Sequence, residues 1–321
     1  MKTISAKYSL SWVNRILDSS GKVVLFITVT ICCLSSMAQK SDQIITISGT
    51  QFANPLVEKW VSEYTKANPG VAFKFVKSAP QNKPADLNLT VISLTKNELS
   101  ANENIVKVGR IAVLPVTNFK NKQFARQLKN GIKQEELKNI FLQGEVDTSS
   151  DGGAQQKGEL PYTVYTQPSQ SATANVLIHH FGKTDTELKG ILVTGDDKFL
   201  IESLLGDSTA VGYSNLGLIY NLHDRTPLAG IRILPIDPDN NGRLKEDEQV
   251  YGNLDKLIVF LESSKNKAVP TEELDFSYNT KNGNPLAVDF VNWVAVTGQQ
   301  YNHQYGFLQT SDEKYTNVSQ K

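Results

Sequence analysis

The twelve residues from Asp237 to Glu248, DPDNNGRLKEDE, place oxygen-bearing side chains at the spacing of a calcium-binding loop. Carboxylate or amide side chains stand at loop positions 1, 3 and 5, a glycine at position 6, and a glutamate at position 12. This alternation gathers hard oxygen ligands around one cation and ends in a carboxylate that binds through both oxygens. The sequence therefore predicts a calcium site formed by Asp237, Asp239, Asn241, Arg243 and Glu248.

The residues before this loop, IRILPI at 231–236, are typical of a strand and not of the helix that precedes an EF-hand loop. Two interpretations therefore stay open. One is a calcium loop in a strand setting, and the other is an acidic turn whose Asp, Asn and Gly residues only shape the backbone. No other cofactor is predicted.

A second pattern that could form a binding site lies near the start of the chain, where TISGTQFANP joins a predicted strand to a predicted helix. The β-branched run ends at Gly49, and the pair Asn54–Pro55 is typical of a helix start. A helix N-terminus presents backbone N–H groups without partners and the positive end of the helix dipole. This junction is therefore suited to an anion or to another acceptor of hydrogen bonds.

Catalytic patterns are not found in the sequence. The four histidines are scattered without metal-binding spacing, and no nucleophile motif, phosphate-binding loop or dinucleotide fingerprint occurs. No nucleophile–base pair or pair of catalytic carboxylates can be assembled from what remains. We therefore expect a binding protein and not an enzyme.

The first 38 residues have the features of a signal peptide. Basic residues precede an apolar run that starts at Val23, and small residues at Ser36 and Ala38 indicate cleavage before Gln39. The apolar run is shorter than the roughly 20 residues of a spanning helix, so a retained anchor is the weaker alternative. We expect a periplasmic protein that does not span the membrane after cleavage.

Removing this leader changes both the cysteine count and the charge. Both cysteines, Cys32 and Cys33, lie inside it, so the mature protein has no disulfide and no cysteine metal site. The mature chain keeps 29 basic and 32 acidic residues, because four basic residues and one acidic residue are removed. No concentrated basic face is indicated, which argues against nucleic acid as a partner.

Strand-like and helix-like patterns alternate along the mature chain, which predicts an α/β architecture that begins with a βαβ unit. Apolar residues at helical spacing follow Pro55, and NPG at 68–70 ends that helix. The predicted strands are 44–49, 71–76, 87–92, 110–118, 161–166, 209–214 and 231–236, and the predicted helices are 54–67, 133–141, 172–182, 197–205 and 286–298.

Several of these segments resemble the periplasmic phosphate-binding proteins of phosphate ABC importers. ISGTQFANPLVEKW resembles the opening signature of that family, and IAVLPVTN resembles the strand that crosses between its lobes. The likeness runs in the same order from about residue 44 to 310, through the further segments ADLNLTVISLTKNEL, IKQEELKNIFLQGE, STAVGYSNLG and DFVNWVAVTGQQYNHQYGF.

The resemblance implies a type II periplasmic-binding-protein fold, in which two α/β lobes joined by two crossovers close on a ligand. We expect residues 42–114 with 231–316 in the first lobe and 115–230 in the second, with exchanges near 112–118 and 222–235. The family also implies a monomer that delivers a small anion or polar solute to the permease of an ABC importer.

The family's ligand positions can be transferred to this sequence, and two of them differ in charge. Val91 stands where the family has a carboxylate, and Gln167 stands where it has an arginine. Loss of the guanidinium removes the charged, two-pronged donor of the site. The ligand-binding residues implied by the resemblance are Thr50, Gln51, Phe52, Thr90, Gln167, Ser169, Ser171 and Thr173.

These residues predict a neutral cleft in which segments 49–52 and 167–173 face each other, both at helix N-termini. Such a cleft suits weakly bound phosphate or another small polar or oxyanion ligand. The alternative function is an exported interaction protein that uses the fold without capturing a small molecule.

Overall fold

The computed structural model describes residues 43–76, 84–91, 102–142, 161–184, 188–263, 267–281 and 283–311. The described residues from Ile44 onward form one compact unit, to which the following description applies. The predicted signal peptide at 1–38 and both cysteines lie outside the described residues. Within the described part, no helix has the length and apolar character needed to cross a membrane.

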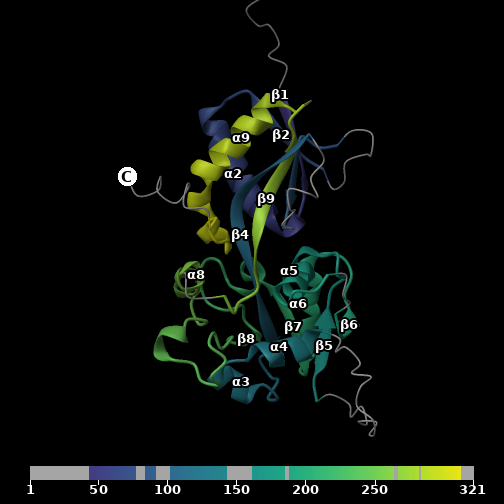
Figure 1. Cartoon of the computed structure of the whole chain (residues 1–321), viewed down its shortest axis with the longest axis vertical. Helices are drawn as coiled ribbons and strands as arrows, with labels where there is room; N and C mark the ends of the chain where they lie inside the picture. The colour runs from purple at the N-terminus through teal and green to yellow at the C-terminus, as the bar shows by residue number, and fades with distance from the viewer. Residues whose placement is uncertain are drawn as a thin grey trace, which may run out of the picture. The chain divides into compact units, whose positions relative to one another are not determined.

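Strands and helices alternate as the sequence predicts, with short 3-10 helices (η) at several turns (Figure 1). The elements are β1 (Gln43–Gly49), η1 (Gln51–Ala53), α2 (Asn54–Ala67), β2 (Val71–Phe75), β3 (Leu87–Thr90), β4 (Glu103–Asn118), α3 (Ala125–Asn130), α4 (Gln134–Phe141), β5 (Thr163–Thr166), α5 (Ala172–His180), β6 (Ile191–Leu192), α6 (Asp197–Gly206), β7 (Ala210–Asn215), α7 (Leu216–Ile219), β8 (Ile231–Ile233), η2 (Glu246–Glu248), α8 (Leu254–Glu262), β9 (Thr271–Asn279), α9 (Pro285–Val296) and η3 (Gly298–Tyr305).

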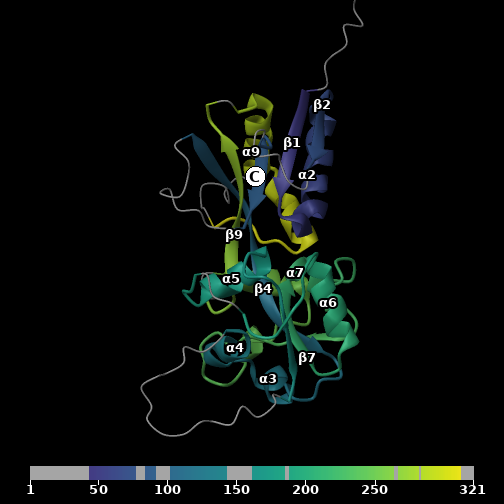
Figure 2. The same cartoon turned by 90° about the vertical axis from the view of Figure 1, so that its right-hand side faces the viewer.

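The strands follow the order β2-β1-β3-β9-β4-β7-β5-β6, and β8 also pairs with β4. The 16-residue strand β4 is shared by two sheets. Its residues 103–112 pair with β9, whereas its residues 113–118 pair with β7 and β8. Figures 1 and 2 both show β4 running from one lobe into the other, and β9 begins beside it at the boundary between the lobes. Within the described residues, β4 and the segment that leads into β9 therefore connect the lobes.

The return to the first lobe lies later in the chain than the sequence analysis placed it. Ile231 and Ile233 on β8 pair with Asn118 and Val116, which lie in the half of β4 that belongs to the second sheet. The backbone rejoins the first sheet at Thr271, which pairs with Ala112. Residues 231–251 therefore lie with the second lobe. After β8, Ile236 pairs with Ile132, Asn240 accepts from the amide of Gln134, and the Tyr251 hydroxyl donates to the carbonyl of Ile236.

Helix α2 shows why the first lobe folds as its sequence predicts. Leu56, Val57, Trp60 and Tyr64 are buried at helical spacing, and Pro55 fixes the first turn. The Trp60 indole donates a 2.9 Å hydrogen bond to the carbonyl of Gly298 and packs beside Phe276. The helix is thereby fixed to both the sheet and the C-terminal segment, and its first turn is held at the end of β1.

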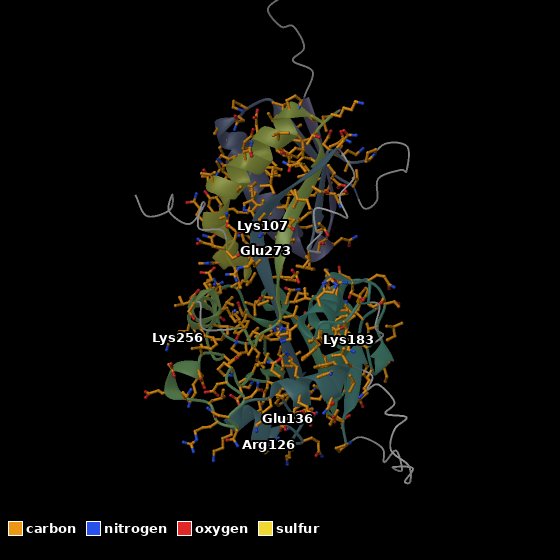
Figure 3. The ribbon with its side chains drawn as sticks, in the orientation of Figure 1. Lys107, Arg126, Glu136, Lys183, Lys256 and Glu273 are labelled. Atoms are coloured by element: carbon orange, nitrogen blue, oxygen red, sulfur yellow. The ribbon has the colours of Figure 1, made fainter. Side chains whose placement is uncertain are left out.

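Ion pairs on the surface contribute less to this arrangement. Lys107 on β4 lies 3.7 Å from Glu273 on β9, and Arg126 on α3 pairs with Glu136 on α4 (Figure 3). Exposed pairs of this kind contribute about 0–1 kcal/mol each, so the buried apolar side chains carry most of the stability.

Candidate functional site

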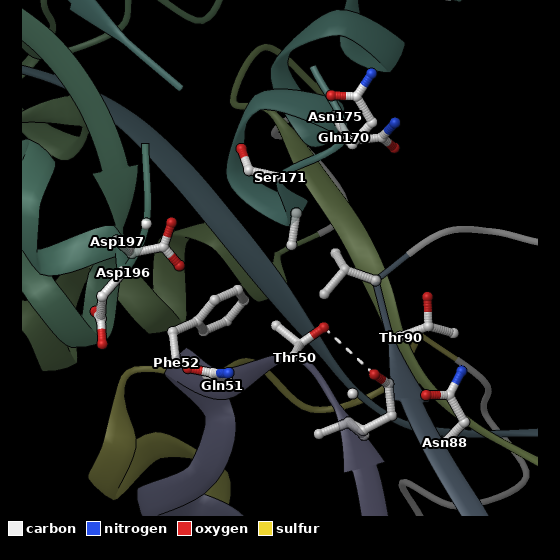
Figure 4. A pocket seen from close by; sticks show the side chains of 15 residues that line it. Thr50, Gln51, Phe52, Asn88, Thr90, Gln170, Ser171, Asn175, Asp196 and Asp197 are labelled. Carbon is white, nitrogen blue, oxygen red and sulfur yellow. Dashed lines mark hydrogen bonds between the residues drawn. The ribbon is translucent and has the colours of Figure 1, made fainter. Parts of the chain in front are cut away.

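A cavity of about 600 Å³ lies between the two lobes, at the ends of strands and the starts of helices (Figure 4). This is the edge of an open α/β sheet where ligands bind. The first lobe contributes Gly49, Thr50, Gln51, Phe52, Asn88, Leu89, Thr90 and Val91, and the second contributes Gln170, Ser171, Ala172, Asn175, Gly195, Asp196 and Asp197.

The first wall is the turn between β1 and α2. Gly49 has a φ of +124°, and a Cβ atom there would lie 2.0 Å from the carbonyl oxygen of Leu89. The amide and hydroxyl of Thr50 donate to that same oxygen at 3.0 and 3.3 Å. The turn therefore needs glycine, and it brings the amides of Gln51 and Phe52 to the start of a helical segment that faces the cavity.

The second wall contains two helix N-termini. Ser171 caps α5, since its hydroxyl accepts a 3.3 Å hydrogen bond from the amide of Ala174. Asp196 caps α6 by accepting a 3.0 Å bond from the amide of Lys198. Both capping residues line the cavity, so the positive ends of two helix dipoles are directed at it.

Behind this wall, Gln167 is buried and hydrogen-bonded within its own lobe. Its side-chain amide donates to the carboxylate of Asp197 at 2.6 Å, and its side-chain oxygen accepts from the Thr173 hydroxyl at 2.6 Å. Its backbone amide donates to the Tyr213 hydroxyl at 3.0 Å. Gln167 therefore orients Asp197 and does not offer its own amide to a ligand.

Asp196 and Asp197 are the charged residues of the second wall, and Asp196 also pairs with the Lys198 ammonium group at 3.7 Å. Burial raises the pKa of Asp197, although the hydrogen bonds from Gln167 and Thr173 act in the opposite direction. Among the described residues that line the cavity there is no lysine or arginine. The donors that face the cavity are therefore amides and hydroxyls, while its charged groups are acceptors.

The structure brings part of the predicted ligand set together. Thr50, Gln51, Phe52, Thr90 and Ser171 line the cavity, so segments 49–52 and 170–172 do lie on opposite walls. Three other predicted residues, Gln167, Ser169 and Thr173, are not among the residues that line it. Buried Gln167 and Thr173 support the wall from behind.

Sequence reasoning missed Asn88, Gln170, Asn175, Asp196 and Asp197. Asp196 and Asp197 follow the short strand β6 and begin α6, a strand-to-helix turn like the one after β1. The rule that places ligands at such turns could have identified both carboxylates.

The residues of the predicted calcium loop lie outside this cavity, in the second lobe after β8. Asp237 and Glu248 are buried, whereas Asp239, Asn241 and Arg243 are exposed. In the part of the chain that the structure describes, no three His, Cys, Asp or Glu side chains are already gathered as a metal site. The calcium site therefore stays a prediction at this point.

Comparison with known proteins identifies the relatives of this architecture. A family model of the PBP superfamily domain matches residues 35–295. No curated protein matches the sequence at a significant level.

Solved structures of phosphate-binding proteins share the fold. The chain is similar to a protein from Clostridium perfringens that is assigned as a phosphate ABC transporter substrate-binding protein and contains bound phosphate. The TM-score is 0.57 and the identity 14%, over 84% of this chain and 100% of that one. An ABC-type phosphate transport receptor from Vibrio cholerae gives a TM-score of 0.54 at 13% identity, covering 83% and 100% of the two chains. At these identities the similarity concerns the fold, and it confirms the expected two-lobed α/β architecture.

Proposed function

Since this chain belongs to the PBP superfamily, we propose that it is a solute-binding protein whose cavity holds a small, uncharged polar solute and binds phosphate only weakly. The resemblance to phosphate receptors is confirmed by the family and the fold, and with it the prediction of a binding protein that is not an enzyme. The proposed class of ligand rests on the side chains that line the cavity.

One observation carries the proposal: two carboxylates and no lysine or arginine are found among the described residues that line the cavity. Two like unit charges 4 Å apart repel by on the order of 4 kcal/mol at an effective dielectric constant of 20. A phosphate dianion beside Asp197 would meet this repulsion without the guanidinium that could offset it. Helix N-termini attract anions by about 0.3–1 kcal/mol each, which is too little to reverse the balance.

A solute with several hydroxyl groups fits the same cavity better. Hydroxyls donate to the carboxylates of Asp196 and Asp197 and accept from the amides of Gln51 and Phe52. The Phe52 ring, which stacks on Phe307 with centroids 6.0 Å apart, adds an apolar surface for carbon atoms. The volume lies within the range of about 300–1,000 Å³ that small-molecule sites occupy.

The family analogy supplies the remaining parts of the proposal. We expect the mature protein to act in the periplasm as a monomer and to deliver its solute to the permease of an ABC importer, through closure of the lobes on the ligand.

Calorimetry of the mature chain tests the ligand class, with neutral polyhydroxyl solutes, phosphate and sulfate titrated in turn. We expect heat of binding with at least one neutral solute, and we expect Asp197→Asn to weaken it by about 10-fold because an acceptor is lost. Asp289→Asn on the exposed face of α9 is the matched control and should leave binding unchanged.

The alternative, an interaction protein that uses the fold without small-molecule capture, makes the opposite prediction. Silence of the folded protein across the whole panel would favour this alternative over a solute receptor.

A further inference from the structure

The segment from Asp237 to Glu248 forms a closed turn that is built from its own polar side chains. Gly242 adopts a φ of +82°, and its amide donates a 2.6 Å hydrogen bond to Oδ2 of Asp237. Asn240 adopts a φ of +57° and accepts a 2.8 Å bond from the amide of Gln134. Loop positions 1 and 6 are therefore already folded toward each other, as a calcium loop requires.

The first residue of this loop contains an unpartnered polar atom. Asp237 is fully buried, and its Oδ1 atom has no hydrogen-bond partner within the described structure. The bond from the Gly242 amide to the other oxygen holds the Asp237 carboxylate toward the middle of the loop. A buried carboxylate oxygen without a partner is costly, and a cation is the ligand that would satisfy it best.

An internal cation already links two other loop positions. The ammonium of Lys245 donates to Oδ2 of Asp239 and lies 3.5 Å from Oε1 of Glu248. These carboxylates occupy loop positions 3 and 12 of the motif, so Lys245 stands between groups that a bound metal ion would join. The Lys245 side chain is 53% exposed, which leaves it free to turn into solvent.

We propose that residues 237–248 bind one calcium ion, which displaces the Lys245 ammonium from Asp239 and Glu248. The ligands are side-chain oxygens of Asp237, Asp239, Asn241 and Glu248, together with the backbone carbonyl of Arg243 at loop position 7. Calcium suits this set because it accepts six to eight oxygen ligands in flexible geometry, whereas magnesium demands a smaller octahedral cage. The ion provides a partner for the Oδ1 atom of Asp237 and stabilises the turn that follows β8.

The presence of Lys245 also determines the strength of binding. Calcium must replace a salt bridge and not only water, so we expect a dissociation constant at the weak end for such loops, about 10⁻⁴–10⁻³ M. Millimolar calcium occurs outside the cytoplasm, so a protein exported to that environment would have its loop occupied there.

The test uses the whole mature protein after treatment with a chelator. Titration with calcium should release or absorb heat with one site per chain, and saturating calcium should raise the thermal unfolding midpoint. Lys245→Gln removes the competing ammonium and should tighten calcium binding about 10-fold, whereas Lys256→Gln, at an exposed position of α8, is the matched control and should not change it. Asp239→Asn, at an exposed position, should weaken binding by about 10-fold.

Absence of heat and of a thermal shift at 10-fold excess over the expected dissociation constant, in both the wild type and the folded Lys245→Gln protein, would overturn the proposal. An equal response to magnesium would do so as well, because it would indicate general screening of charge. Neither outcome depends on a solute in the interlobe cavity, so this test is independent of the proposed transport function.

Discussion

The side-chain amide of Gln167 donates a 2.6 Å hydrogen bond to the carboxylate of Asp197, thirty residues further along the chain. The resemblance to phosphate receptors places an arginine at position 167. In this protein a neutral amide stands there instead, and it orients an acidic group toward the cavity. Where the phosphate receptors have the positive charge of an arginine, this pair presents a hydrogen-bond acceptor, the carboxylate of Asp197. This difference changes the class of ligand that the cavity favours.

Restoring positive charge at this pair should restore phosphate binding. Gln167→Arg alone should raise phosphate affinity little, because Asp197 would form an ion pair with the new guanidinium. The double variant Gln167→Arg/Asp197→Asn leaves the guanidinium uncompensated and should raise the affinity by ~10-fold or more, measured by calorimetry at pH 8.

The control for this prediction is Asp197→Asn alone, which removes the repulsion but adds no charged donor. If the folded double variant binds phosphate no better than this control, a guanidinium at position 167 does not act on a ligand in the cavity, and the prediction fails.

The raised pKa of Asp197 should make the stability of the protein depend on pH. Burial raises its pKa above the ordinary value of 3.8. The protonated carboxyl group therefore stabilises the folded state more than the ionised carboxylate does. The favourable contribution is complete below pH 3.8 and is lost as the pH rises through the pKa of the folded state. Asp197→Asn keeps an oxygen that can accept from Gln167, so we expect this variant to unfold at a higher temperature than the wild type at pH 7.

The difference between the two proteins should shrink as the pH falls toward 3.8. Thermal unfolding of both, followed by circular dichroism from pH 8 to pH 4, measures it. A difference in midpoint that does not change over this range would contradict a raised pKa at Asp197.

Much of the fold could be predicted from apolar periodicity and from glycine and proline positions. The pattern from Leu56 to Tyr64 defined α2, and the β-branched run before Gly49 defined β1. Strand β9 was missed, since its TEELDFSYN sequence begins with polar residues and only Leu274–Ser277 are buried. Its place between β3 and β4 depends on partners more than 150 residues away in the sequence, which local patterns do not contain.

Only those residues of the site whose position depends on the backbone could be predicted from the sequence. The turn at 49–52 followed from a strand that meets a helix, and the structure places it on the cavity wall. Gln167 was expected to face the ligand because of its position in the family motif. In the structure Gln167 does not face the cavity, because hydrogen bonds with Tyr213 and Thr173 hold it behind the wall.

The turn at Gly49 should not tolerate a side chain. Gly49→Ala would force a φ of +124° on alanine and place its Cβ 2.0 Å from the Leu89 carbonyl oxygen. We expect a loss of about 2–4 kcal/mol in the free energy of unfolding, measured in urea. Gly206→Ala at the end of α6 is the control, because nothing lies within 4 Å of its added Cβ, and it should change stability by less than about 1 kcal/mol.

The first lobe should depend on the Trp60 indole. Trp60→Phe removes the 2.9 Å hydrogen bond to Gly298 and leaves a small cavity at a fully buried position. The expected loss is about 2–3 kcal/mol in the free energy of unfolding. Trp293→Phe, at a partly buried position, should cost clearly less, and equal losses for the two variants would contradict the packing described for α2.

The most direct test of the account is the affinity of the wild-type mature protein for phosphate at pH 8, where phosphate is mainly a dianion. Isothermal titration calorimetry with the chelator-treated protein measures it without a label. An acidic cavity without a guanidinium predicts a dissociation constant weaker than about 1 mM, or no measurable heat. A dissociation constant in the micromolar range or tighter would contradict the account, and would show that this cavity binds phosphate as its primary ligand.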